Sequence, residues 1–451
     1  MAMNENFEKI QTLLEHKRYV PLIANLNEMN EVDVAHVLDM QSPAQALLLF
    51  RMLPKNLAAN VFAQLSSSKQ SAFLATITDR ELAPILAELA MDDIVDLVEE
   101  MPANAVKRIL AQTGETERQV INQLLKYPED SAGSLMTTEY VDLEKQMTVH
   151  DALCCIRETG LKKETVYTCY VIDQNRFLHG VISLKKLVLS QGDLLIENLC
   201  ERDCIFVHTH DDQEAVAAVF KKYGFLALPV VDTERRLIGI ITVDDIMDVM
   251  QQEVTEDFQI MAAMQPSDEA YLETEVFTLV KHRIGWLLLL MVSETFTGNL
   301  IAGYEDLLVT ATALTTFIPM LMDTGGNSGS QSSTLIIRGL ATGEIQLHDW
   351  LRVLYKELRV ALAVGGILGT TSLVKTYFIN GKPLALCGSV GITLMITVVA
   401  AKLTGGLLPI LAKKLCLDPA IMAGPLITTI VDTTSLFVFF NVARVVLRWP
   451  L

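Results

Sequence analysis

Apolar residues are distributed unevenly along this chain, and the pattern changes near residue 280. Before that point hydrophobic positions recur at helical or alternating spacing, whereas long apolar runs dominate after it. Five of these runs approach the roughly 20 residues that a helix needs to cross a bilayer. The expected spans are Ile284–Ala302, Leu307–Met322, Val360–Tyr377, Leu386–Leu411 and Ile421–Leu447. The pattern therefore predicts a multi-domain membrane protein, in which soluble domains precede a five-helix transmembrane domain over residues 281–451.

Residues 1–126 form the first predicted domain. Leu and Ala recur there at helical spacing and β-branched runs are few, so we expect an all-α domain. Two similar phrases, MLPKNLAANVFAQL around Pro54 and EMPANAVKRILAQ around Pro102, are offset by 48 residues. An internal repeat of this kind is typical of a superhelical array of short helices.

A stronger internal repeat relates Thr148–Leu189 to Asp212–Val249. Each copy is expected to form a helix, a strand, a turn, a second strand and a second helix. The strand pairs YVID…HGVIS and PVVD…IGIIT match position for position. Two such α/β units resemble the modules of a CBS-domain pair, which pack as a pseudo-dimer. The predicted modules are residues 127–199 and 200–250.

A strongly acidic stretch follows the repeat. Met250–Leu279 contains seven acidic residues and no basic one, and we expect a connecting helix over residues 251–280. Residues 1–275 carry 45 acidic against 23 basic residues, a net charge of −22, whereas residues 276–451 carry +4. Because acidic surfaces repel each other, the expected partner is a hard divalent cation such as Mg²⁺, which prefers oxygen ligands. Nucleic acid is not an expected partner.

One carboxylate is conspicuous among the apolar runs, because Asp432 is the single acid of the last span. A charged group at bilayer depth costs about 2.5–3.5 kcal/mol on insertion scales, so it usually faces water or a partner. At helical spacing Gly424, Thr428 and Ser435 share its face. This polar stripe predicts a cation path. Two alternatives are a protonated carboxyl and a pair with Lys402 on a neighbouring helix.

The second span changes character after Pro319. Three glycines and Asn327 follow within a few residues. Lipid cannot satisfy the backbone groups of so glycine-rich a segment, so it must line a cavity or pack against another helix. We therefore expect Asn327 to line the ion path together with Gly424 and Thr428.

The ends of the chain and of its spans predict an orientation. MAMNENFEKI lacks the basic start and apolar core of a signal peptide, so the N-terminus is expected to stay in the cytosol. Eight basic residues flank the predicted cytosolic ends of the spans and four flank the outer ends. An odd number of spans places the C-terminus outside a plasma membrane. No P-loop, nucleophile elbow or His-rich centre is present, so we do not expect an enzyme.

The order of these parts and two motifs resemble the MgtE family of magnesium channels. The motifs are FIPMLMDTGGNSGSQSSTLIIRGLATGEI and DPAIMAGPLITTIVD, and YPEDSAGSLMT opens the CBS pair. The resemblance covers essentially the whole chain. It implies a homodimer surrounded by membrane lipid, with a pore between protomers where Asp432 of each chain holds a hydrated Mg²⁺. It also implies that Mg²⁺ bound between the cytosolic domains closes the pore when internal Mg²⁺ is high.

The resemblance carries a Mg²⁺ sensor onto acids of three segments. These are Asp92 and Asp96 in the helical domain, Asp212, Glu214, Asp245 and Asp248 in the second CBS module, and Glu253, Glu256 and Asp257 in the connecting helix. Two positions depart from the family pattern, because Gly224 and Asn60 stand where family members can carry an acid.

A nucleotide is the other ligand that the resemblance suggests. Many CBS modules bind an adenosine ribose through a small hydroxyl followed three residues later by Asp. The second module has Thr242 and Asp245, whereas the first has Ser183 and Lys186. Any ATP or AMP site is therefore expected to depend on Thr242 and Asp245.

Two other functions stay open at this point. The predicted path contains no Cys or His, which disfavours soft metals but leaves Mn²⁺ and Co²⁺ as alternative cargo. The second alternative is a membrane-anchored adenylate sensor, in which the CBS pair acts and the spans only anchor it. Asp432 and the glycine-rich segment favour transport, because an anchor needs neither.

Overall fold

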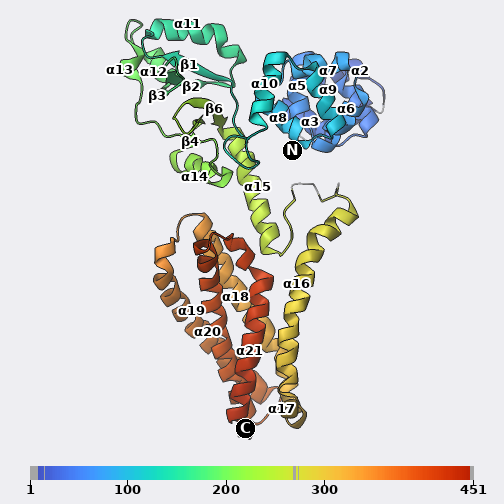
Figure 1. Cartoon of the computed structure of the whole chain (residues 1–451). Coiled ribbons are helices and arrows are strands. Elements are labelled where there is room, and N and C mark those ends of the chain that lie inside the picture. Colours follow the sequence, from blue (N-terminus) through green and yellow to red (C-terminus); the bar gives the residue numbers. More distant parts are fainter. Residues whose placement is uncertain (1–8, 15, 268–270, 273, 447–451) are drawn as a thin grey trace. The chain divides into compact units, whose positions relative to one another are not determined.

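The computed structural model describes residues 9–14, 16–267, 271–272 and 274–446. The chain divides into two compact units, Met1–Met250 and Gln251–Leu451 (Figure 1). Each unit contains its own buried apolar clusters, so each is described by itself.

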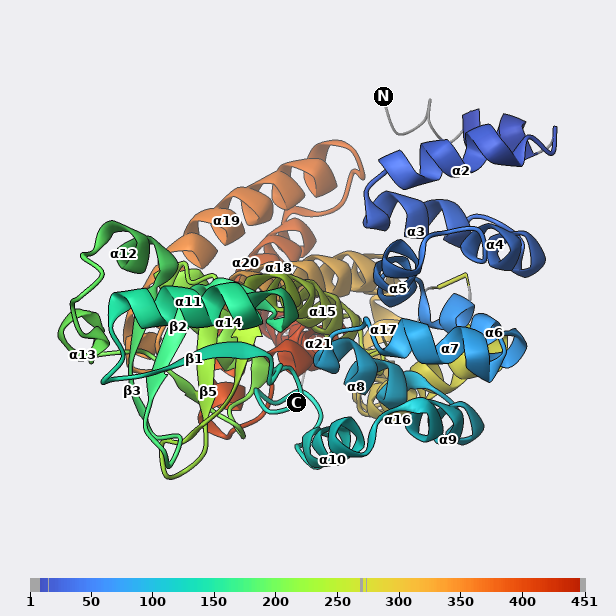
Figure 2. The same ribbon diagram turned by 90° about the horizontal axis from the view of Figure 1, so that it is seen from above.

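The first unit begins with a run of short helices, which follow one another in Figure 2. They are α2 (Tyr19–Glu28), α3 (Glu31–Asp39), α4 (Pro43–Phe50), α5 (Lys55–Ala63), α6 (Ser67–Thr76), α7 (Asp79–Leu86), α8 (Met91–Glu100), α9 (Ala103–Gln112) and α10 (Glu115–Leu124). Helix α3 packs on α5, α5 on α7 and α7 on α9, so the predicted helical array is confirmed. Pro54 and Pro102 are the N-cap residues of α5 and α9, and the two similar phrases form equivalent helices.

The internal repeat forms two small α/β modules. The first contains β1 (Tyr140–Glu144), α11 (Val149–Thr159), β2 (Thr165–Ile172), β3 (Leu178–Ser183), α12 (Leu184–Leu189) and α13 (Ile196–Leu199). The second contains β4 (Val207–His208), α14 (Gln213–Tyr223), β5 (Ala227–Val231), β6 (Leu237–Thr242) and the start of α15 (Val243–Met261). Each sheet has three strands in sequence order, β1-β2-β3 and β4-β5-β6. Both predicted strand pairs, β2 with β3 and β5 with β6, are antiparallel ladders.

The predicted repeat unit did not include the strand that precedes the first helix of each module. Strands β1 and β4 each pair in parallel with the strand that follows them, and α11 packs on the first sheet (Figure 2). The modules share a buried cluster that includes Tyr140 and Tyr170 from one and Leu237 and Ile240 from the other. The predicted pseudo-dimer is therefore present.

The acidic connecting segment differs from its prediction. Helix α15 begins at Val243, inside the second module, and ends at Met261, so a single helix over residues 251–280 is wrong. Ala263 adopts a left-handed conformation with φ 56°, and the Met264 amide donates to the Gln259 carbonyl at 2.9 Å. This hydrogen bond closes the helix C-terminus in the manner of a Schellman motif. The next helix begins only at Val276.

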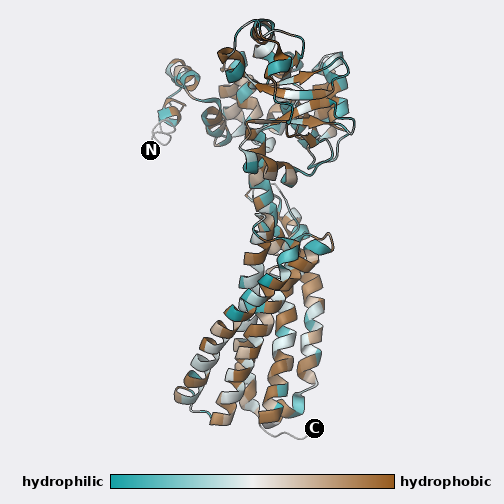
Figure 3. Cartoon of the chain, turned by 90° about the vertical axis from the view of Figure 1, so that its left-hand side faces the viewer, coloured by the Kyte–Doolittle hydropathy of each residue, from teal (hydrophilic) through white to brown (hydrophobic). Residues whose placement is uncertain are grey.

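The second unit is a bundle of long helices. They are α16 (Val276–Ala302), α18 (Ile318–Ala341), α19 (Trp350–Phe378), α20 (Leu384–Lys414) and α21 (Gly424–Val446), with shorter elements α17 (Glu305–Thr310), η2 (Thr312–Phe317), η3 (Leu347–Asp349) and η4 (Pro419–Met422). Among the described residues, four segments are long and apolar enough to cross a membrane, and they contain α16, α19, α20 and α21. Figure 3 shows how hydrophobic residues predominate along these helices.

The second predicted span needs a correction. Leu307–Met322 is not one helix, because Leu307–Phe317 forms a short helix and a 3-10 segment before α18 begins. Helix α18 instead contains the glycine- and serine-rich residues that the prediction placed after the span. Its polar content lowers its mean hydropathy, yet it packs closely on α20 and α21.

Candidate ion-binding sites

Glycines of α18 bring its backbone against α21. A Cβ atom at Gly325 would lie 2.9 Å from Val431 Cγ1 and 2.8 Å from Ser435 Oγ. At Gly329 a Cβ atom would lie 2.6 Å from Ile427 Cγ2. Larger side chains are excluded at these positions, because helices approach this closely only through small residues. The expectation that the glycine-rich segment packs against another helix is confirmed.

Asp432 lies on α21 at this contact and is only 6% exposed. Its Oδ1 atom is buried and has no hydrogen-bond partner among the residues that the structure describes. An unpaired buried acceptor of this kind costs about 1–3 kcal/mol, and more when it is charged, unless a donor or cation supplies the missing interaction. No ion pair joins Lys402 to it in the described part of the chain, since Lys402 Nζ donates to Ser332 Oγ at 3.4 Å.

Two further acids accompany Asp432, and the sequence argument did not name them. Glu294 on α16 and Asp323 on α18 are its electrostatic neighbours. The hydroxyls of Thr297 and Thr433, 2.9 Å apart, join α16 to α21 at this level. Glu294 lies inside the first predicted span, so a search for every acid within the spans would have found it.

The other residues predicted for the path divide between two surfaces. Thr428 faces α18, because a Cβ atom at Gly326 would lie 2.9 Å from its Cγ2, and its hydroxyl donates to the Gly424 carbonyl at 2.9 Å. Asn327 is exposed on α18 and its amide donates to Asp323 Oδ1 at 3.0 Å. Among the described residues no three Asp, Glu, His or Cys side chains gather closely enough to hold a bare metal ion. Carboxylates spaced in this way suit an ion that keeps its water shell.

A second group of acids lies in the first unit, where α8 meets the start of α15 and the loop before β2. Burial, then the charges of Asp245 and Asp93, raises the pKa of Asp92 to about 9. Burial and the neighbouring charges of Asp245 and Asp244 raise the pKa of Glu164 to about 7. Asp92 Oδ1 is buried without a hydrogen-bond partner. These carboxylates destabilise one another unless protons or cations neutralise them.

Asp96 and Asp245 belong to the same group. Desolvation, followed by the charges of Asp93 and Asp245, raises the pKa of Asp96 to about 7. Burial raises the pKa of Asp245 to about 6, although the Thr242 hydroxyl donates to its Oδ2 at 2.6 Å and opposes the shift. The structure thus brings three predicted sensor acids together and adds Asp93, Glu164 and Asp244, which the sequence argument did not name.

Three other predicted sensor acids of the first unit are exposed. Asp212 caps α14 by accepting from the Glu214 amide at 2.9 Å, and both side chains are exposed. Asp248 is exposed on α15. Gly224 ends α14 with a left-handed φ of 66°, a conformation that favours glycine at the end of a helix.

The cleft that could hold a nucleotide is not lined by the residues that the sequence predicted. A cleft of about 300 Å³ in the CBS pair is lined by Ser183, Glu201 and Asp203 from one side and by residues 224–229 from the other. Thr242 and Asp245 do not line it. Lys186, which replaces the expected acid, lies 3.5 Å from Glu201 Oε1.

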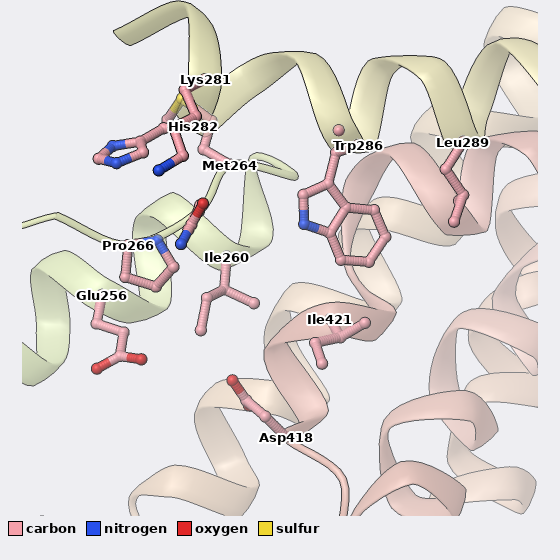
Figure 4. Close-up of a pocket in the computed structure, with 12 residues that line it drawn as sticks. Glu256, Ile260, Met264, Pro266, Lys281, His282, Trp286, Leu289, Asp418 and Ile421 are labelled. Carbon is pink, nitrogen blue, oxygen red and sulfur yellow. The ribbon is translucent and has the colours of Figure 1, made fainter. Parts of the chain in front are cut away.

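A cavity of about 610 Å³ lies in the second unit between the end of α15, the start of α16 and η4 (Figure 4). Its polar lining includes Glu256, Asp418 and Lys281, and its apolar lining includes Trp286 and Ile421. Of the three acids predicted in the connecting helix, Glu256 lines this cavity, whereas Glu253 and Asp257 do not.

The end of α15 also contacts the beginning of α21, the helix that carries Asp432. Ile260 and Met261 pack on a cluster of Ile337, Ala420 and Ala423. A Cβ atom at Gly424 would lie 3.4 Å from the Met261 carbonyl oxygen. The C-terminal end of α15 therefore lies against the first residue of α21 within the second unit.

The raised pKa values of the first unit predict a pH dependence. An acid whose pKa is raised in the folded state binds protons more tightly there, so stability falls as pH rises from the unfolded values near about 4 towards about 9. In chelator, the unfolding temperature of the first unit should therefore be higher at about pH 6 than at about pH 8.5. Saturating Mg²⁺ should flatten this slope, because the cation replaces the protons. A midpoint in chelator that rises with pH would contradict this prediction.

These observations define the class of the protein. The apolar helices of the second unit enclose the contact between α18 and α21, where Asp432 is buried. A helical array and a CBS pair precede this bundle in the sequence. This combination is that of a regulated membrane transporter for cations.

Comparison with known proteins narrows this class. The profile of the MgtE family, described as a divalent cation transporter, matches residues 318–442, and that of the MgtE intracellular N domain matches residues 29–130. The CBS-domain profile matches residues 196–252. The chain is 38% identical to the magnesium transporter MgtE of Thermus thermophilus over 94% of both chains. It is 30% identical to the Bacillus subtilis magnesium transporter MgtE over 96% of this chain and 98% of that protein.

Solved structures agree with this assignment. The cytosolic domain of the Mg²⁺ channel MgtE in complex with ATP superposes with a TM-score of 0.52 at 34% identity, covering 54% of this chain and 99% of that one. The soluble part of a magnesium transporter gives the same TM-score at 31% identity, covering 56% and 99%. The chain therefore belongs to the MgtE family of divalent cation transporters.

Proposed function

We propose that this chain forms a Mg²⁺ channel that admits the ion through the plasma membrane and closes when cytosolic Mg²⁺ is high. The observation that carries the proposal is the buried, unpartnered Oδ1 of Asp432 at the contact between α18 and α21. Its neighbours Glu294 and Asp323 make the surroundings negative, so a cation is the ligand that this position lacks. The names of the relatives support Mg²⁺ as that cation.

The ion passes with its water shell. Mg²⁺ dehydrates reluctantly, and the carboxylates near Asp432 are too far apart to replace its waters. Hydrogen bonds from bound water to Asp432, Asn327 and the hydroxyl-bearing face of α21 hold the ion weakly enough for it to leave. A potential of 100 mV drives each divalent ion with about 4.6 kcal/mol, so no other energy source is required.

Two copies of the chain complete the path. In one chain Asp323 and Asn327 are exposed on α18, although that helix lies within a membrane domain. A polar face of this kind needs water or a second protein surface rather than lipid. A homodimer with facing α18 and α21 helices satisfies both chains at once. In the proposed orientation the N-terminus lies in the cytosol and the C-terminus outside, as the basic residues beside the spans predict.

Mg²⁺ in the first unit supplies the gate. The group of Asp92, Asp96, Glu164 and Asp245 is destabilised without a cation, and its buried Asp92 Oδ1 fits a hard oxygen-seeking ion. Ions that bind only the compact arrangement stabilise it by mass action. Helix α15 starts at this group and ends against Gly424, so it is the element that transmits the change. The Glu256 and Asp418 carboxylates line the cavity of the second unit and offer a further cation-binding position near the C-terminal end of α15.

ATP is a proposed second ligand of the soluble part. A relative's cytosolic domain was solved with ATP, and the cleft beside Ser183 is the space that this chain offers. Its acids Glu201 and Asp203 disfavour bare phosphates, so we expect ATP to bind as its Mg²⁺ complex. Calorimetry with Mg-ATP should show weaker binding for Ser183→Ala than for Thr242→Ala, which reverses the expectation from the sequence.

Ion flux tests the proposed function. Purified full-length protein in liposomes should take up Mg²⁺ under an inside-negative potential, and Mn²⁺ or Co²⁺ should compete for the same path. Liposomes without protein provide the baseline. Uptake of Mn²⁺ or Co²⁺ with no uptake of Mg²⁺ would favour the alternative cargo. Absence of any flux from protein that still binds Mg-ATP would favour the membrane-anchored adenylate sensor.

A further inference from the structure

Three buried polar side chains connect three helices on the side of α18 away from Asn327. Ser332 of α18 donates its hydroxyl to Glu357 Oε2 of α19 at 2.6 Å. Lys402 of α20 donates from Nζ to the same Ser332 Oγ at 3.4 Å. Ser332 is 1% exposed, Lys402 4% and Glu357 9%. This Lys402–Ser332–Glu357 network takes no part in the ion path described above.

Each charge in the network would be costly alone. Lys402 lies 12 residues before the end of α20, about 18 Å along the helix axis, which places it well inside the bundle. A lone ammonium or carboxylate at such depth destabilises a membrane helix, so intramembrane charges pair with one another. Here the serine hydroxyl bridges the two charges, donating to the carboxylate and accepting from the ammonium.

The packing around the network is specific to it. A Cβ atom at Gly406 would lie 3.1 Å from Glu357 Cγ, so a glycine makes room for the carboxylate. A Cβ atom at Gly405 would lie 2.2 Å from the Gly329 carbonyl oxygen, so α20 and α18 meet backbone to backbone one turn from Ser332. The neighbouring Ser333 donates to the Met422 carbonyl at 2.6 Å.

Helix α18 needs such anchors more than its neighbours do. Residues 324–333 read TGGNSGSQSS, and glycine and serine are weak helix formers, each glycine costing about 1 kcal/mol relative to alanine. The opposite face of the same segment carries Asn327 and adjoins Asp323. Its rotation about the helix axis therefore decides which groups face the ion.

We infer that Lys402, Ser332 and Glu357 form a positioning network. In this network the Lys402 ammonium balances the charge of the Glu357 carboxylate, and Ser332 fixes the rotation of α18 about its own axis. The network lies beyond the proposed ion path, and it rests on the proposed function only where Mg²⁺ flux is the readout. Its stability effects are independent of transport.

A double-mutant cycle tests the pairing of the two charges. Lys402→Met and Glu357→Gln each leave one buried charge unpaired, and the fraction of protein that stays folded on heating should fall about tenfold or more for each. The double variant removes both charges and should recover most of that loss. Lys356→Met, which changes an exposed lysine next to Glu357, is the matched control and should behave as the wild type. Single variants that lose nothing, or a double variant that loses as much as their sum, would overturn the pairing.

Ser332→Ala tests the positioning role. The variant should remain folded with a lower unfolding temperature, because the hydrogen bonds to two buried charges are lost, and it should require about tenfold more Mg²⁺ for half-maximal flux, because α18 is no longer held at one rotation. Thr370→Val is the control, since the Thr370 hydroxyl bonds only its own helix at the Gly366 carbonyl, 2.7 Å away. An unchanged Mg²⁺ dependence in folded Ser332→Ala would overturn the positioning role. Absence of flux from the wild type would contradict the proposed function. The double-mutant cycle on stability would still show whether Lys402 and Glu357 are paired.

Discussion

Replacing Asp432 by alanine should abolish Mg²⁺ uptake while leaving the protein folded. The substitution removes the single carboxylate of α21, and with it the buried oxygen that lacks a partner. Because that oxygen gains nothing from the protein, its removal should raise the unfolding temperature rather than lower it. Uptake should fall to the level of liposomes without protein. Asp432→Asn should retain a small fraction, since an amide still hydrogen-bonds to the water shell of the ion.

The control for this experiment is an acid outside the path. Glu305 lies in the short helix α17 between α16 and α18, and its side chain is exposed. Glu305→Ala should transport as the wild type. Normal uptake by folded Asp432→Ala would show that the ion does not pass this carboxylate.

The second large effect concerns the acids of the first unit. Asp92→Asn combined with Asp245→Asn removes two negative charges from the group, which lowers the mutual repulsion and weakens Mg²⁺ binding. The first unit should then stay compact in chelator, and the protease resistance of the connecting residues 251–267 should no longer depend on Mg²⁺. Flux should likewise become insensitive to cytosolic Mg²⁺. The physical reason is that a neutral amide does not repel its neighbours and attracts a divalent cation far more weakly than a carboxylate does.

Asp33→Asn provides the matched control, because this half-buried acid of α3 lies outside the group. Chelator should increase its proteolysis as in the wild type. A wild-type protein whose cleavage ignores Mg²⁺ would mean that the acids are a solvated surface and not a sensor.

The elements that could be predicted from sequence are those with strong local signals. The helical array and both copies of the α/β repeat follow from periodicity and from the matching strand pairs. Strand β4, with only Val207 and His208, has no such signal, because its position is fixed by pairing with β5. The end of α15 at Met261 was missed although Pro266, five residues further on, is a helix-breaking signal in the sequence. Ala263 adopts a left-handed conformation after the helix, and the sequence gives no sign of it because glycine is the usual residue in that conformation.

The site shows the same division. Asp432 could be found because it is the single acid in an apolar run. Glu357 and Lys402 could not be paired from sequence, because 45 positions separate them and Glu357 lies outside the predicted span that begins at Val360. Likewise Asp92, Glu164 and Asp245 come from three distant segments, and only the fold brings them together. Long-range juxtapositions of charge are properties of packing, which periodicity does not encode.

Uptake measured at controlled Mg²⁺ on the cytosolic side tests the central claim most directly. Full-length protein in oriented liposomes should conduct Mg²⁺ when the solution facing residues 1–275 is chelated. It should close when that solution contains saturating Mg²⁺, and Asp432→Ala should conduct in neither case. Equal flux at low and high cytosolic Mg²⁺, in protein that conducts through Asp432, would contradict the account of a pore gated by its own ion.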